Sequence, residues 1–289
     1  MQTIQERPAA TVDVQPDTFK TLLVHAEPGL VASHRLEVAG CLARDLGACL
    51  IGLGAETFDP LGASAPEGAY FAAGLLAAQQ EQTEKDLVAA EAAFRRDAGG
   101  AELEWRTVRD YPHLALTRMA RAADLILVGP QTGADTTRSA DPADVVMGAG
   151  RPVLIVPEGA HRLHGKTVVV AWKDTRECRR ALSDAMPFLR RAEDVIVHTV
   201  CRPGDADAAV AQVDEVIANL ARHGVRARPL VTGTAAAGVA SEIKRVAELY
   251  GADLIVCGAY GHSRLREWAF GGVTAELMRR PGCFVLMSH

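Results

Sequence analysis

The chain has 289 residues, which is long for one domain and ordinary for two. Hydrophobic residues make up 48% and charged residues 23%, as in globular proteins with a buried core. The net charge of -5, with no run of lysine and arginine, argues against nucleic acid as a partner. No apolar stretch reaches the roughly 20 residues of a membrane helix, and the polar first 18 residues lack the apolar segment of a secretory signal. We therefore expect a cytoplasmic protein without a membrane partner.

In chain order, short aliphatic runs alternate with helical patterns. Continuous apolar runs are typical of strands that helices bury on both faces. In the first half, we expect strands near residues 21–24, 48–53, 103–108, 124–128 and 153–156, and a long helix around 78–95. In the second half, we expect strands at 167–172, 195–200, 225–231, 253–257 and 284–287, and helices at 176–189, 209–222 and 237–250.

The two halves repeat each other. Residues 19–25 (FKTLLVH) reappear as 165–171 (GKTVVVA), and residues 123–129 (ADLILVG) reappear as 252–258 (ADLIVCG). Residues 151–157 (RPVLIVP) correspond to 280–286 (RPGCFVL). Three matches in the same order at similar separations indicate an internal duplication.

Alternating strands and helices of this length form a mainly parallel sheet with right-handed helical crossovers. The sequence therefore predicts two tandem doubly wound α/β domains, each with a five-stranded sheet flanked by helices. We expect a disordered or extended lead at 1–18, domains at 19–157 and 166–289, and a linker at 158–165. Because this linker is too short for a flexible spacer, the domains should pack on each other.

A glycine-rich segment follows the fourth strand of the second half. Gly258 and Gly261 would let the chain turn sharply off the strand, and Gly271 and Gly272 would open the next helix near the same cleft. The backbone N–H groups at such a helix start attract phosphate. The intervening flap carries His262, Arg264 and Arg266. The segment therefore predicts a cradle for a di- or triphosphate.

This G-x-x-G-x9-G pattern resembles the ATP-binding loop of the universal stress protein family. The resemblance extends over both repeats, although only the second repeat has the loop. It implies a strand order of 3-2-1-4-5 in each sheet and a cytoplasmic stress-response regulator that binds ATP, with Mg, in the second domain. By position, Gly258, Gly261 and Gly271 match the phosphate-loop glycines, and Val273 and Thr274 follow in register.

In that strand order, the first and fourth strands of the second sheet would flank one cleft. Trp172, Lys173 and Asp174 would then face it together with Gly258, and we include Val200 among the expected nucleotide contacts. Two residues depart from the family pattern. Lys173 stands where ATP-binding members usually have an acidic residue, with Asp174 one place later; Gly272 replaces a serine or threonine. Lys173 could instead pair with phosphate.

The first repeat has lost this pattern. Pro130 removes a backbone donor at the corresponding turn, and Asp135, Asp141 and Asp144 place negative charge where phosphate would lie. We expect this domain to be a structural partner of the second. The family commonly dimerises through its fifth strand, which implies an intramolecular pseudo-dimer through 153–156 and 284–287, with a further homodimer left open.

Other functions remain open at this stage. The chain could be an interaction protein of the same fold without nucleotide. Alternatively, His25, Glu27, Asp110 and His113 follow strands that end at one edge and could converge on a metal or serve as general acid and base. The sequence has no H-E-x-x-H, G-x-S-x-G or P-loop motif, so it indicates at most slow ATP hydrolysis.

Overall fold

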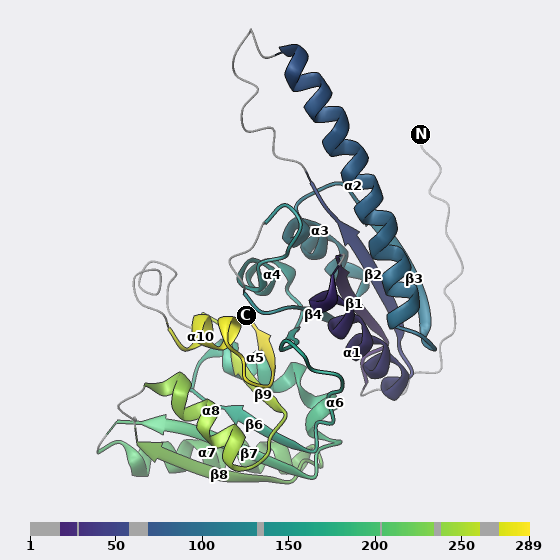
Figure 1. The fold of residues 1–289 in the computed structure, drawn as a ribbon. Helices are drawn as coiled ribbons and strands as arrows, with labels where there is room; N and C mark the ends of the chain where they lie inside the picture. Colours follow the sequence, from purple (N-terminus) through teal and green to yellow (C-terminus); the bar gives the residue numbers. More distant parts are fainter. Residues whose placement is uncertain are drawn as a thin grey trace, which may run out of the picture.

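The computed structural model describes residues 18–27, 29–57, 69–131, 136–202, 204–233, 238–260 and 272–289 (Figure 1). In the first half, the elements are β1 (Thr21–Ala26), α1 (Leu30–Leu46), β2 (Cys49–Ala55), α2 (Ala69–Asp97), β3 (Glu102–Val108), α3 (Pro112–Met119), the short 3-10 helix η2 (Ala120–Ala122), β4 (Leu125–Val128), α4 (Pro142–Ala149) and β5 (Val153–Ile155).

The second half repeats the alternation. Its elements are β6 (Thr167–Ala171), α5 (Arg176–Asp184), α6 (Met186–Leu189), β7 (Asp194–Cys201), α7 (Ala206–Arg222), β8 (Ala227–Gly233), α8 (Val239–Leu249), β9 (Leu254–Gly258), α10 (Val273–Arg279) and β10 (Phe284–Ser288).

The strands form one sheet, in the order β3-β2-β1-β4-β5-β10-β9-β6-β7-β8. Each half contributes five parallel strands in the predicted order 3-2-1-4-5. The halves meet where β5 and β10 pair antiparallel, with Leu154 opposite Leu286. Both strands are apolar and fully buried, and this pairing leaves neither as an exposed edge. The predicted doubly wound fold is confirmed.

Two helical layers cover the sheet. Because side chains alternate along a strand, Val168 and Val170 face one layer and Val169 faces the other. Helices α1, α2, α5 and α7 cover the first face, and α3, α4, α8 and α10 cover the second. Each layer therefore contains equivalent helices of both halves, as the antiparallel central pair requires.

Three element boundaries differ from prediction. The expected helix at 176–189 is divided into α5 and α6 around Ala185, because Pro187 in the first turn of α6 cannot donate a backbone hydrogen bond. Helix α2 begins at Ala69 rather than near residue 78 and extends past the ends of the strands (Figure 1). The edge strands β3 and β8 are only half-buried, and β8 starts at Ala227 instead of residue 225.

The two halves also touch away from the central strands. The rings of Phe19 and Phe188 are 5.5 Å apart, and Arg162 Nη2 donates to both carboxylate oxygens of Asp45 at 3.1 Å. Arg191 Nη1 donates to the carbonyl oxygen of Asp45 at 3.2 Å. These contacts hold the two halves together beside α1, as expected of domains that pack on each other. Within the described residues, no helix is long and apolar enough to cross a membrane.

Candidate functional site

The candidate site lies at the carboxyl edge of the second half, where β6 and β9 end side by side. Their register pairs Ala171 with Cys257, so the segments after both strands leave the sheet next to each other. From β6, the chain continues to β7 on one side, whereas β9 neighbours β10 on the other. Ligands of open α/β sheets bind at such a reversal of strand order.

Gly258 ends β9 against the first turn of α5. A Cβ at this position would lie 2.4 Å from the backbone nitrogen of Cys178 and 2.6 Å from the carbonyl carbon of Glu177. Both are backbone atoms, which cannot rotate away. The side chain of Thr175 caps α5 at the same place, with Cys178 N donating to Thr175 Oγ1 at 3.3 Å. Glycine at 258 is therefore required for strand-to-helix packing, whatever else this position does.

Helix α10 begins beside the same edge. Gly272 is its N-terminal flanking residue, with φ -64° and ψ 168°, a backbone conformation open to any residue. Thr274 is buried, and Val273 packs against the same apolar cluster as Val200 of β7. The other two predicted glycines, Gly261 and Gly271, lie outside the described residues, as do His262, Arg264 and Arg266.

The remaining predicted residues divide between the two faces of the sheet. Trp172 packs in the cluster beneath α5 and α7, opposite the face that holds Val200. Asp174 forms an ion pair with Arg179 of α5, and the Lys173 side chain is exposed. Among the described residues of the predicted site, Trp172 and Asp174 therefore line one hollow, whereas Val200 and Val273 pack on the opposite face of the sheet.

The sequence profile of the universal stress protein family matches residues 165–289, which span β6 to β10. The second half of the chain is therefore a universal stress protein domain. A search of curated proteins finds no match to the chain.

Solved structures carry the same fold across both halves. A universal stress protein from Archaeoglobus fulgidus DSM 4304 aligns with a TM-score of 0.66 and 17% identity, covering 93% of this chain and 95% of that one. A functionally unknown protein from Pseudomonas aeruginosa PAO1 aligns with a TM-score of 0.55 and 17% identity, covering 93% and 92%. At these identities, the likeness establishes the fold of the tandem chain.

A buried polar cluster that the sequence did not predict lies beneath β7 of the universal stress protein domain. His198 is 1% exposed, and its Nε2 lies 2.9 Å from Thr232 Oγ1. Burial lowers the pKa of His198 to about 4, against a raising effect of Glu242 and a further lowering by Arg245. Arg245 donates to both carboxylate oxygens of Glu242, at 2.7 and 2.8 Å, and these bonds lower the Glu242 pKa. The available sequence signal was a histidine inside an apolar strand.

In the first half, charged side chains lie at the sheet edge that corresponds to the candidate site of the second half. A cavity of about 180 Å³ there is lined by His25, Glu27, Arg35, Gly129 and Ser139, among others. Arg35 Nη2 donates to Glu27 Oε1 at 3.0 Å, and Ser139 Oγ donates to Glu27 Oε2 at 2.8 Å. A Cβ on Gly129 would lie 2.7 Å from Arg35 Nη1, so the guanidinium fills the space beside the turn.

Burial sets the protonation of this cluster. Burial lowers the pKa of His25 and, together with Arg35, outweighs the raising effect of Glu27, so the ring is neutral at neutral pH. Burial raises the pKa of Glu27, but Arg35, His25 and Ser139 together lower it by more than burial raises it. The net shift is therefore downward, and the carboxylate stays charged.

The four-residue cluster considered from sequence does not assemble. His25 Nδ1 lies 3.8 Å from Glu27 Oε2, but Asp110 pairs with Arg118 instead. The ring of His113 lies against Tyr111, with 5.9 Å between centroids. Among the described residues, no group of three or more histidine, cysteine and acidic side chains could hold a metal ion.

Proposed function

We propose that the second half binds an adenine nucleotide, ATP with Mg, and that the chain is a stress-response regulator. The observation that carries this proposal is the universal stress protein domain at 165–289, in which Gly258 and Gly272 flank the connection that leaves the sheet at its strand reversal. Under this proposal the chain hydrolyses ATP slowly at most.

In this proposal, the phosphates lie against the segment between Gly258 and Gly272. Gly272 has no side chain that would cover its own backbone N–H, and Lys173, exposed at the same edge, would supply a positive charge. Val200 and Val273 pack against one apolar cluster and would offer the base a hydrophobic wall. The chemistry that ATP would supply is a transferable, Mg-bound triphosphate.

A second function has a specific observation in its favour. Asp174, the acidic residue nearest the family's nucleoside contact, is already paired with Arg179 on the face opposite Val200. Without an acidic contact to the nucleoside, the domain would bind ATP weakly, or the chain would act through protein contacts alone. The Glu27–Arg35 pair in the first half supports a structural role for that half under either function.

Calorimetric titration of the nucleotide-stripped chain with Mg-ATP, ADP and AMP separates these functions. We expect one site per chain. Gly272→Val should weaken it at least tenfold, because a branched side chain would cover the helix start while its extended backbone stays allowed. Gly99→Val is the matched control, since among the described residues a Cβ there would meet only Arg96 O, at 3.7 Å. An absence of heat at millimolar ligand would assign the chain to the interaction-only class.

A further inference from the structure

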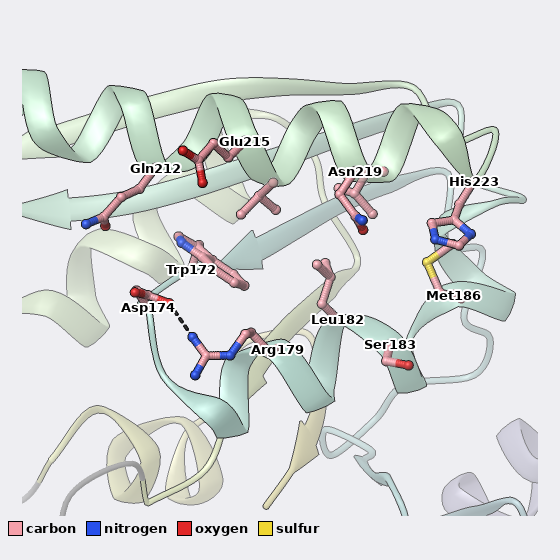
Figure 2. Close-up of a pocket in the computed structure, with 12 residues that line it drawn as sticks. Trp172, Asp174, Arg179, Leu182, Ser183, Met186, Gln212, Glu215, Asn219 and His223 are labelled. Atoms are coloured by element: carbon pink, nitrogen blue, oxygen red, sulfur yellow. Dashed lines mark hydrogen bonds and ion pairs between the residues drawn. The ribbon is translucent and has the colours of Figure 1, made fainter.

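A second hollow lies on the opposite face of the second half, between α5, α6 and α7 (Figure 2). Its volume is about 470 Å³, within the range of pockets that hold small organic molecules. We call it the α5–α7 cleft. Its floor is apolar, formed by Trp172, Leu182 and Leu220, all of them buried, with Val216 and Met186 at the sides.

The floor carries an unpaired hydrogen-bond donor. Trp172 is 7% exposed, and its Nε1 is buried with no hydrogen-bond partner among the described residues. In Figure 2, the indole lies between the two helices, with Glu215 of α7 on one side and Arg179 of α5 on the other. Leaving a buried donor unsatisfied costs stability, so buried N–H groups normally find a partner. The unpaired donor in the cleft points to a bound acceptor.

Charged side chains at the rim of the cleft restrict which kind of molecule can carry that acceptor. Asp174 and Arg179 neutralise each other in an ion pair at one end of the cleft. Glu215 is exposed on the rim and has no ion-pair partner among the residues described. The remaining charge is therefore negative, which disfavours carboxylates and phosphates and favours neutral or cationic molecules.

The repeat supplies an internal comparison. Residues 165–171 correspond to 19–25, so Trp172 corresponds to Ala26 of the first half. Ala26 is 2% exposed and packs in the core at the end of β1. The indole thus distinguishes the second repeat from the first at this position, although its N–H has no partner in the described part of the chain.

We propose that the α5–α7 cleft binds a small neutral or cationic molecule with a flat apolar body and an oxygen acceptor for the Trp172 N–H. The body would lie over Leu182 and Leu220, and a cationic end would meet Glu215. Because Val200 and Val273 pack on the other face of the sheet, this site is separate from the proposed nucleotide site.

Nile red is a suitable probe, since it is uncharged, flat and apolar and carries a ring carbonyl. Titration of the full chain, followed by dye emission, should give one saturable site. Asn219→Trp, which adds bulk on an exposed rim position of α7, should weaken binding at least tenfold. Trp172→Phe keeps an aromatic floor but removes the donor and should weaken binding about fivefold, the size expected of one neutral hydrogen bond.

Trp105→Phe is the control, because Trp105 packs on Phe94 in the first half and should leave dye affinity unchanged. Gly272→Val should also leave dye affinity unchanged, so a failure of the nucleotide proposal stays distinguishable from a failure of this one. Absence of saturable dye binding, or equal dissociation constants for the wild type, Trp172→Phe and Asn219→Trp, would overturn the proposal.

Discussion

Acidification should destabilise the chain through His198. This ring lies inside the sheet with Nε2 against Thr232 Oγ1, and its Nδ1 is buried without a hydrogen-bond partner among the described residues. Burial holds its pKa at about 4, below the ordinary value of 6.5. Between these two values, the unfolded chain binds a proton that the folded chain does not. The contribution of His198 is therefore fully present above pH 6.5 and is lost as the pH falls toward 4.

The size of this loss follows from the two pKa values. One unit of pKa shift corresponds to about 1.4 kcal/mol. Between about pH 7 and about pH 5, the linkage of this one group lowers the free energy of unfolding by about 2 kcal/mol. Against a typical stability of about 5–15 kcal/mol, this is a measurable fraction.

Urea unfolding, followed by tryptophan fluorescence at both pH values, measures this loss. His198→Gln is the informative variant, because its amide can still reach Thr232 but does not titrate. The variant should lose about 2 kcal/mol less than the wild type over the same pH interval. Other groups, including His25 and Glu27, titrate equally in both proteins and cancel in the comparison. Equal losses in wild type and variant would refute the burial argument.

Three further predictions concern packing, charge and capping. Gly258→Ala should destabilise the chain by about 1–3 kcal/mol, because its Cβ would overlap the α5 backbone. Thermal unfolding should show no such loss for Gly233→Ala, whose Cβ would meet none of the described residues within 4 Å, and equal midpoints would contradict the packing role. Arg35→Met should cost about 3–5 kcal/mol, because it leaves the Glu27 carboxylate half-buried without its cation; a urea midpoint within error of wild type would exclude this. Asp141→Ala should cost about 1 kcal/mol by removing the cap of α4, whereas Asp141→Asn, which keeps an acceptor, should lose less in the same urea assay.

The sequence by itself determined the duplication, the order of elements and the family resemblance. Hydrophobic periodicity is local, so the apolar run at residues 253–257 predicts a buried strand, and the helical pattern at 237–250 predicts the helix before it. Alternation of strands and helices then leaves few arrangements of the sheet. Local pattern also predicts the edge strands β3 and β8. It does not predict that they are half-exposed, because that depends on which elements lie beside them.

Only the tertiary structure decided which side chains meet. A single residue along a strand reverses the side-chain direction, so Trp172 and Val200, both near strand ends, lie on opposite faces. The sequence predicts that Gly258 contacts phosphate. In the structure, its immediate constraint is packing, because a Cβ at this position would lie 2.4 Å from the α5 backbone. Arg35 lies on α1, ten residues after His25, and its guanidinium lines the first-half cavity and donates to the His25 carbonyl oxygen. Such contacts join distant segments, and their geometry exists only once the sheet and its helices have packed.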